Sequence, residues 1–286
     1  MDNVFWLVST ERLKDGLWFR DEEDFKSGMN LVAVEATVMD VGVMAFVLMS
    51  NHVHFLLGGG KDSVINFINR FKTRYSQYFS KKYGIGGLLR KNAVDVREVC
   101  VGDESFERAV AYIQMNSVAA NICLHPTAYP WGTGDAFFRQ QAPRGVRVGD
   151  MTARACIRLF HSKVALPKDY VVDNRGFIDT SSYVQVKFVE SVFRTPNRMD
   201  YYLRFSSKAR HMHINEGPSF GDQILVAAIH DLSVSLFRRN GLQELGEAQQ
   251  AEILKQLKRR FSSDPNQLSR VTGMGYDTVC RLLDQP

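Results

Sequence analysis

The pattern of apolar and polar residues predicts short alternating strands and helices in the N-terminal part of the chain. A first strand is expected over Val4 to Ser9, and the polar stretch Asp21 to Asp24 leads into a short helix. The apolar, β-branched segments Leu31 to Asp40 and Val43 to Met49 are expected to be strands. His52 to Leu57 continues the second of these after a kink.

A long amphipathic helix is expected from Val64 to about Lys82, where Asp62 or Ser63 caps its start and Gly84 stops it. A further strand follows over Val94 to Val101, and another helix comes after it. Strands and helices in this order, arranged around one antiparallel sheet, predict an α+β fold of the ferredoxin-like type over residues 1–138.

The chain changes character after this region. A linker that contains Pro143 and Gly145 is expected over residues 139–149. Residues 150–286 are expected to form a second, mostly α-helical domain, with a small hairpin at Tyr170 to Ile178.

Residues 264–283 have the layout of a helix-turn-helix. Ser269 lies where the two helices meet, Gly273 makes the turn, and Val279 and Leu282 anchor the second helix. A helical hairpin that only packs is the alternative interpretation. If the module binds duplex DNA, the side chains facing the groove or the phosphates would be Tyr276, Asp277, Thr278, Arg281, Lys255, Lys258, Arg259 and Arg260.

Composition and charge distribution predict that the protein binds nucleic acid. The 286 residues are 45% hydrophobic, and 36 Lys and Arg against 31 Asp and Glu give a net charge of +5. Cations and aromatics alternate between residues 70 and 91 without any acid, which suits a surface that binds single-stranded or looped nucleic acid. A helix with buried aromatics and solvated cations would show the same pattern. The candidate nucleic-acid-binding residues are Arg70, Lys72, Arg74, Tyr75, Tyr78, Lys81, Lys82, Arg90 and Lys91.

Cysteine spacing and hydropathy narrow the class of protein further. The four cysteines lie far apart without Cys-x-x-Cys spacing, so we expect reduced core thiols and neither a zinc ribbon nor a disulfide framework. The sequence has no signal-peptide pattern and no apolar run of transmembrane length. We therefore expect a cytoplasmic, nucleoid-associated protein with no membrane partner.

The chemistry-bearing feature is the pair His52 and His54. Side chains two apart on a strand point to the same face, so the two imidazoles can share one divalent metal ion. Two solvated or structural histidines are the alternative. Leu56 stands where a nucleotide-hydrolase triad would need a third histidine, and no acid follows closely. The pair therefore needs a third ligand from elsewhere in the chain.

The helix expected after Asp103 offers that ligand. Tyr112 and Asn116 are one helical turn apart and share a face beside the buried stripe. A phenol can attack a phosphodiester and hold it covalently, and an amide oxygen can join the shell of a metal ion. Taken alone, a tyrosine and an asparagine on a helix are ordinary.

Three motifs in order resemble one family. They are Met49-Ser50-Asn51-His52-Val53-His54, Tyr112-Ile113-Gln114-Met115-Asn116-Ser117-Val118 and Tyr129-Pro130-Trp131-Gly132. Together they are similar to the single-tyrosine HUH transposases, specifically the REP-associated tyrosine transposases, over residues 1–138.

The resemblance implies a DNA transposase or endonuclease that cleaves and rejoins single-stranded or hairpin (REP-like) DNA. It implies that His52, His54 and Asn116 bind Mg²⁺ or Mn²⁺ and that Tyr112 is the nucleophile, forming a 5′-phosphotyrosine. The partners would be single-stranded or hairpin DNA and, through the C-terminal domain, duplex DNA, with the protein a monomer or homodimer. A catalytically silent DNA-binding or regulatory protein derived from such a transposase is the alternative.

Two positions depart from the family pattern, because Ser50 and Ser117 stand where the family has proline. Prolines there would shape the backbone without touching metal or phosphate, so we expect altered rigidity and retained chemistry. A second His-x-His, at His211 and His213, lacks a surrounding apolar strand and is interpreted as a polar loop.

Overall fold

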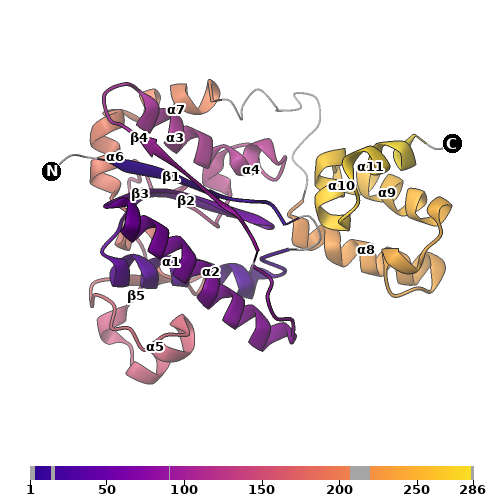
Figure 1. The fold of residues 1–286 in the computed structure, drawn as a ribbon, viewed down its shortest axis with the longest axis horizontal. Helices are drawn as coiled ribbons and strands as arrows, with labels where there is room; N and C mark the ends of the chain where they lie inside the picture. The colour runs from indigo at the N-terminus through magenta and orange to yellow at the C-terminus, as the bar shows by residue number, and fades with distance from the viewer. Residues whose placement is uncertain (1–3, 14–16, 90, 207–219, 285–286) are drawn as a thin grey trace.

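A computed structural model describes residues 4–13, 17–89, 91–206 and 220–284 of the chain. Its centre is a four-stranded antiparallel sheet with the strand order β2-β3-β1-β4. The strands and the two helices that connect them are β1 (Phe5–Thr10), α1 (Glu22–Met39), β2 (Gly42–Met49), β3 (His52–Gly58), α2 (Lys61–Tyr83) and β4 (Val94–Val99). This order of elements is the ferredoxin-like arrangement, so the predicted α+β fold is confirmed (Figure 1).

Helix α1 corrects the expectation of a strand over Leu31 to Asp40. Asp21 caps the helix by accepting a hydrogen bond from the backbone N–H of Asp24 at 2.9 Å, and Asp40 ends it in the left-handed conformation. The segment is apolar on most sides because residues 28–36 are buried between the sheet, α2 and later segments. Burial on most sides removes the helical periodicity that would have distinguished this segment from a strand.

Strands β2 and β3 form a hairpin. The kink expected between them is a tight turn at Ser50 and Asn51, after which the chain reverses and pairs Met49 with His52. The two segments are therefore neighbouring antiparallel strands, and β3 lies between β2 and β1 in the interior of the sheet.

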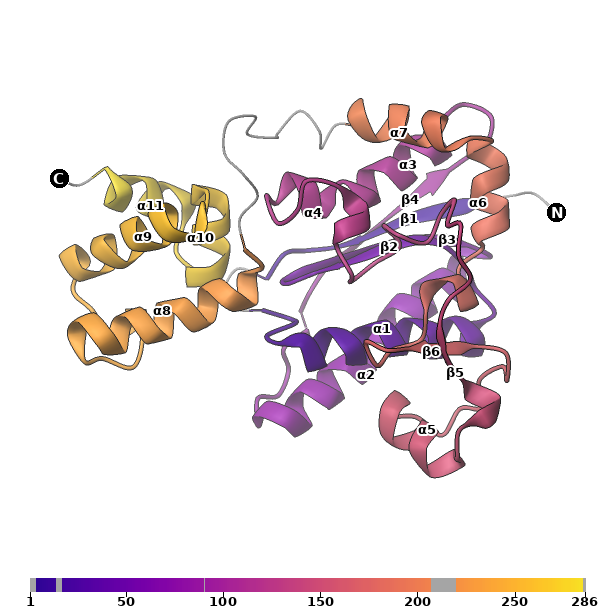
Figure 2. The same ribbon diagram turned by 180° about the vertical axis from the view of Figure 1, so that it is seen from behind.

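Side chains of β3 alternate between two hydrophobic cores. Val53, Phe55 and Leu57 pack with α1 and α2 on one face. Leu56 packs on the opposite face with α3 (Ser105–Gln114), and the two histidines share the parity of Leu56. The sheet thus directs both imidazoles toward α3 and α4 (Asn116–Ala119), the helices that lie across the sheet from α1 and α2 in Figures 1 and 2.

The ends of α2 and α3 differ in detail from expectation. Gly84 stops α2 as predicted, with φ at 70° and its N–H on the Ser80 carbonyl at 2.9 Å. The helix begins at Lys61 after Gly60, so neither Asp62 nor Ser63 is its cap. Asp103 accepts a hydrogen bond from the N–H of Ser105 at 2.9 Å, where α3 begins.

Tyr129 to Thr133 close the β2 edge of the sheet. The N–H of Leu48 donates to the Trp131 carbonyl at 2.8 Å, and the Tyr129 hydroxyl donates to the Leu48 carbonyl at 2.8 Å. A Cβ on Gly132 would lie 2.7 Å from the Phe46 carbonyl oxygen, so only glycine fits this approach. The third sequence motif therefore has a structural role along the C-terminal half of this strand edge, whose other end pairs with Val184.

Residues 139–206 pack onto the same sheet domain. Their elements are β5 (Gly145–Arg147), η2 (Val148–Asp150), α5 (Ala153–Phe160), β6 (Val171–Asp173), η3 (Thr180–Ser182), α6 (Val186–Phe193) and α7 (Pro196–Arg204), preceded by η1 (Pro126–Ala128). The expected linker contains β5, which pairs with β6. Phe160, Phe177 and Ile178 join the core beneath α1, and Val189 and Phe193 join the core around α3. By packing, this segment belongs with residues 4–138.

The last helices form a second body, on the right in Figure 1, with a hydrophobic core of their own. They are α8 (Asp222–Phe237), η5 (Leu242–Glu244), α9 (Glu247–Phe261), α10 (Pro265–Thr272) and α11 (Tyr276–Leu283). Gly273 turns the chain between α10 and α11 with φ at 72°, and Val279 and Leu282 are fully buried. The predicted helical hairpin is present in this mostly helical part.

Three further predictions from the sequence concern membrane spans, the cysteines and the second histidine pair. None of the helices over the described ranges is long and apolar enough to cross a membrane. All four cysteines are free thiols, although Cys100 is exposed and only Cys123 is buried. The pair His211 and His213 lies outside the described residues.

Candidate active site

His52 and His54 lie side by side at the start of β3, as predicted. Their ring centroids are 4.9 Å apart, with the rings nearly perpendicular. Both side chains are buried, at about 4% exposure each. Burial of two adjacent imidazoles on one face of a central strand is compatible with a shared cation, and it does not suit two solvated surface histidines.

A neighbouring side chain orients each imidazole. The Asn51 amide nitrogen donates to the Leu13 carbonyl at 3.2 Å, which directs its oxygen to His52 Nδ1 at 2.8 Å. Because this oxygen can only accept, the neutral His52 ring carries its proton on Nδ1 and a lone pair on Nε2. His54 Nδ1 lies 2.8 Å from the Ser9 hydroxyl on β1. Such contacts orient metal-binding histidines in proteins generally.

Tyr112 reaches the pair from α3. Its ring lies edge-on to His54 with the centroids 5.3 Å apart. The side chain is half-buried, and this burial raises the pKa of the phenol, an effect that the positive charges of Arg12 and Arg97 oppose. Arg97 is paired with Asp95, whose charge raises the pKa of the phenol, so Arg12 is the cation near Tyr112 that favours an anionic group there.

Asn116 lies one turn beyond Tyr112, where α3 ends and α4 begins. The helix is interrupted at Met115, and the Asn116 amide nitrogen donates to the Tyr112 carbonyl at 2.8 Å. This bond fixes the amide and leaves its oxygen as the atom that can bind a cation. Asn116 is buried, as is Ser117, whose hydroxyl accepts from the Cys123 thiol at 3.3 Å. Position 117 lies in the first turn of α4, where either proline or serine is tolerated.

The donor set fits a hard or borderline divalent cation. Over the described residues, no group of three or more His, Cys, Asp or Glu side chains is placed to hold a metal ion. Among the described residues, a third protein ligand would thus be an amide, a hydroxyl or a backbone oxygen, and Asn116 offers an amide oxygen. Two imidazoles with such an oxygen are compatible with Mg²⁺ or Mn²⁺ and leave positions for water or phosphate.

Several of the predicted nucleic-acid-binding side chains on α2 have partners inside the protein. Arg70 and Arg74 bind the two oxygens of Glu35, a fully buried carboxylate of α1, at 2.7 and 2.8 Å. Tyr75 is fully buried and its hydroxyl donates to the Trp18 carbonyl. A base cannot stack on Tyr75 in this position.

Tyr78 and Lys82 also face α1. The Lys82 ammonium lies 2.6 Å from the Asp21 carboxylate and 2.8 Å from that of Asp24. The Tyr78 hydroxyl donates to Asp24 at 3.1 Å. Burial is the main reason that the pKa of Tyr78 is raised, and the charge of Asp24 adds to it. The basic and aromatic stripe thus serves largely to join α1 to α2.

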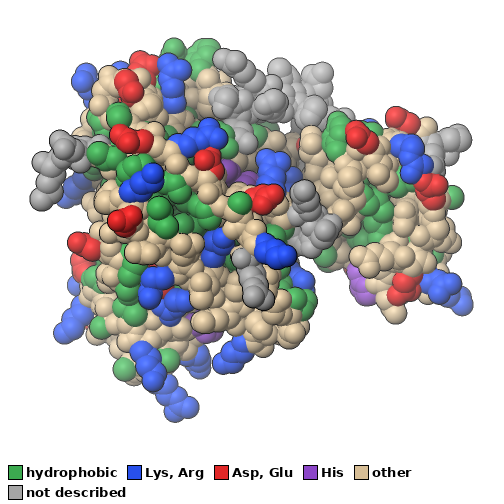
Figure 3. Space-filling view, in the orientation of Figure 1, with side chains coloured by type: hydrophobic (Ala, Val, Ile, Leu, Met, Phe, Trp, Pro, Cys, Tyr) green, Lys and Arg blue, Asp and Glu red, His purple; other side chains and the backbone are tan. Residues whose placement is uncertain are grey.

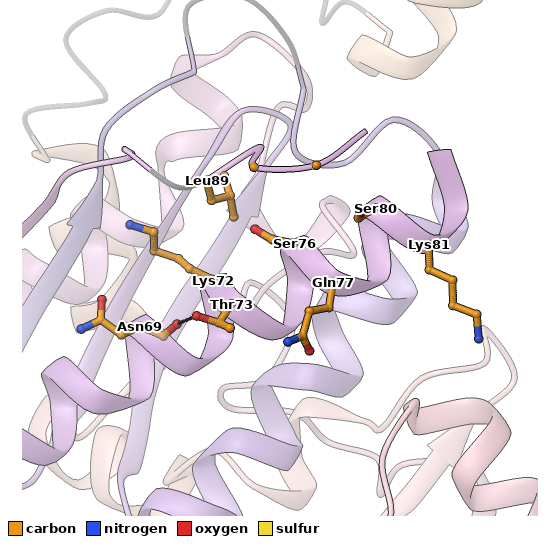
Figure 4. A pocket seen from close by; sticks show the side chains of 10 residues that line it. Asn69, Lys72, Thr73, Ser76, Gln77, Ser80, Lys81 and Leu89 are labelled. Carbon is orange, nitrogen blue, oxygen red and sulfur yellow. Dashed lines mark hydrogen bonds between the residues drawn. The ribbon is translucent and has the colours of Figure 1, made fainter. Parts of the chain in front are cut away.

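The remaining cations border an open groove of about 790 Å³ between α2 and residues 86–89. Its floor is polar, as Figure 4 shows, with Asn69, Thr73, Ser76 and Gln77 along the helix. Lys72 is buried at one end and donates to the Asn92 carbonyl, whereas Lys81 is exposed at the other. Lys91 is exposed, and Arg90 lies outside the described residues. Lys81 and Lys91 remain predicted DNA contacts.

A buried ion pair fastens the helical body to the loop before His52. Asp222 of α8 accepts from Arg270 Nε at 2.6 Å and from Nη2 at 2.8 Å, and Gln267 donates to it at 3.1 Å. The hydroxyl of Ser50 donates to the same carboxylate. We call this group of side chains the Asp222 clamp. Two more bonds cross the junction, from Gln223 to the Phe19 carbonyl and from Asn121 to the Ser262 carbonyl.

The Asp222 clamp explains why a serine, and not the proline of the family pattern, suits position 50. The Ser50 carbonyl accepts from the N–H groups of Trp18 and Phe19, which a proline could also do. The serine hydroxyl donates to Asp222, whereas a proline at this position has no donor to offer that carboxylate.

The fold and this cluster define an α+β domain with a histidine pair and a tyrosine brought together across a sheet and a helix. Residues 20–116 match the model of the family described as "Transposase IS200 like", a family of tyrosine HUH nucleases. Over these residues the chain is therefore similar to the IS200-like transposases. Searches of curated proteins and of solved structures returned no match.

Sequence reasoning did not identify Ser9, Arg12 or Asp222 as part of this region. Ser9 faces His54 only through the register of β1 against β3, which the pattern of residues does not reveal. Asn51 lies within the first motif, and its place directly before His52 was a signal that the sequence offered. Asp222 is far from every motif in the chain.

Proposed function

We propose that this protein is a metal-dependent DNA transposase or endonuclease of the REP-associated tyrosine type. It cleaves and rejoins single-stranded or hairpin DNA through Tyr112, which holds the 5′-phosphate of the cleaved strand. The observation that carries the proposal is the packing of the Tyr112 ring against His54, which itself packs against His52.

Each residue has a defined task in this reaction. His52, His54 and Asn116 would hold Mg²⁺ or Mn²⁺, which when bound polarises the scissile phosphate and stabilises the leaving 3′-oxygen. Asn51 and Ser9 keep the imidazoles in the orientation that binding needs. The Tyr112 oxygen attacks phosphorus and its proton passes to solvent, while the 3′-oxygen leaves and takes up a proton.

Rejoining is the reverse exchange, in which a 3′-hydroxyl attacks the phosphotyrosine and Tyr112 leaves. Each step exchanges one phosphodiester for another, so no nucleotide cofactor is required. The basic balance of the chain, at net +5, suits a DNA partner.

The test is incubation with end-labelled single-stranded hairpin DNA and Mn²⁺, followed by a denaturing protein gel. We expect a covalent adduct with the parent protein, none with Tyr112→Phe, and an undiminished adduct with the surface control Tyr201→Phe, since Tyr201 is 57% exposed. Binding without an adduct under every metal and DNA tried would favour the silent DNA-binding protein. An adduct that persists in Tyr112→Phe would remove Tyr112 as the nucleophile.

A further inference from the structure

A second cavity lies where the helical body meets the transposase domain. Its volume is about 430 Å³, within the roughly 300–1,000 Å³ typical of small-ligand sites. Arg12, Leu13 and Asn51 form one wall, and residues 266–275 of α10 and the turn after it form the other. Figure 3 shows basic and histidine side chains at the surface near this junction.

The charge of the cavity is positive. Arg270 lines it but is balanced by its bidentate bond to Asp222, so this pair contributes no net charge. Arg12 forms no ion pair with a carboxylate within the described ranges of the chain, and the lining of the cavity includes no acidic residue. A guanidinium with no carboxylate partner among the described residues, with the Asn266 amide on the opposite wall, is a favourable environment for a single anionic group.

Arg12 also connects this cavity to the reaction centre. Its side chain is exposed overall, yet partial enclosure of the guanidinium is the main reason that its pKa is lowered, and the charge of Arg270 adds to this. Tyr112 interacts electrostatically with the same guanidinium. Arg12 therefore lies within electrostatic range of both the nucleophile and α10.

Asn51 supplies a second connection. It lines the cavity and at the same time orients His52. A strand of DNA whose scissile phosphate lies at Tyr112 would have its adjacent backbone within reach of this cavity, because successive phosphates are only a few ångströms apart along a strand.

We propose that the cavity between the two bodies binds a backbone phosphate of the substrate strand next to the cleavage site, with Arg12 as its principal ligand and Asn266 on the opposite wall. This inference rests on the proposed function for the identity of the ligand as single-stranded DNA. It assigns the helical body a direct part in holding the cleaved strand, in addition to any contact with duplex DNA.

The probe is a fluorescein-labelled oligothymidylate of about 16 nucleotides, the upper end of single-strand site sizes. Binding is measured by anisotropy over a range of salt concentrations, without metal, in the Tyr112→Phe background. Loss of one phosphate contact is expected to lower the salt slope by about 0.7, which corresponds to roughly fivefold weaker binding for Arg12→Gln at 0.1 M salt. The matched control is Arg154→Gln, an exposed arginine of α5 on the far side of α1, which should bind like the parent.

A second variant adds charge without endangering the fold. Asn266→Asp places a carboxylate in the first turn of α10, where the helix dipole favours it, but the same carboxylate repels a phosphate in the cavity. We expect weaker binding than the parent at low salt and convergence of the two at high salt.

The outcomes separate this inference from the proposed function. Parent-like affinity and salt slope in both Arg12→Gln and Asn266→Asp would overturn the phosphate site, even if the covalent adduct forms normally. No binding of the oligonucleotide to the parent would overturn it as well. Weaker binding in both variants together with no adduct under any condition would support the site while rejecting the cleavage reaction.

Discussion

At the scale of single residues, the proposed reaction centre depends on side chains that orient its histidines without being proposed ligands themselves. His52 can present Nε2 to a cation because Asn51 accepts the proton on Nδ1, and Asn51 is in turn fixed by the Leu13 carbonyl. The proximity of His52 and His54 followed from their spacing on a strand, and the structure also brings Tyr112 beside them. Ser9 was not predictable, since a serine near the end of a strand has no distinguishing pattern.

The Asn51 contact can be tested through metal affinity. Asn51→Ala removes the acceptor that selects the His52 tautomer, and loss of such a partner typically weakens metal binding about 10- to 100-fold. Calorimetric titration with Mn²⁺ measures the effect, and ¹⁵N NMR of the imidazoles shows whether the Nδ1 proton shifts to Nε2. Asn69→Ala, at an exposed position on α2, is the control. Equal Mn²⁺ affinity in the parent and Asn51→Ala would contradict this role.

At the scale of elements, helix α2 shows that a run of cations in the sequence does not reveal which of them pair inside the protein. Its end at Gly84 and its buried stripe follow from the sequence, because a left-handed cap and helical periodicity are local properties. The partners of its cations are not local. Glu35 lies in a segment expected to be a strand, so its pairing with Arg70 and Arg74 could not be anticipated until that segment was known to be a helix.

Two matched variants on α2 separate structural from DNA-binding cations. Arg74→Gln removes half of the compensation of a buried carboxylate and should lower the free energy of unfolding by about 1–3 kcal/mol. It should leave the salt dependence of DNA binding unchanged. Lys81→Gln should leave the free energy of unfolding unchanged, because Lys81 is exposed beside the groove. It should reduce the salt dependence of DNA binding. Urea unfolding and anisotropy provide the two measurements.

At the scale of the whole molecule, the two bodies meet through polar groups at the loop before His52. The helical hairpin was predictable from Gly273 and the apolar spacing around it. The packing of residues 139–206 against the sheet was not, because apolar residues show that they are buried without showing which core receives them. The Asp222 clamp joins side chains that have no relation in sequence.

The clamp predicts a dependence of stability on pH. Burial alone would raise the pKa of Asp222, but Arg270, Ser50 and Gln267 together lower it below its ordinary value. A carboxyl whose folded pKa is lowered adds stability above its unfolded pKa of about 3.9 and loses it as the pH falls through the folded value. Asp222→Asn should therefore be less stable than the parent by about 3 kcal/mol at pH 7.

The difference should narrow as the pH falls below about 4, where the parent carboxyl also becomes neutral. Urea unfolding followed by tryptophan fluorescence between about pH 3 and pH 7 measures it. Asp231→Asn, on an exposed position of the same helix, controls for loss of a charge. A difference that stays constant over this range would show that ionisation of Asp222 does not stabilise the junction.

The contact between Ser50 and Asp222 spans 172 positions of the chain. During synthesis on the ribosome, the histidine pair, Tyr112 and Asn116 all emerge long before α8 and α10. The loop that precedes His52 therefore acquires its contact with Asp222 only after α8 has been synthesised. A fragment that stops before Asp222 keeps every residue of the proposed reaction centre but removes the acceptor of the Ser50 hydroxyl. Experiments on such a fragment would examine a different loop from the one in the full chain.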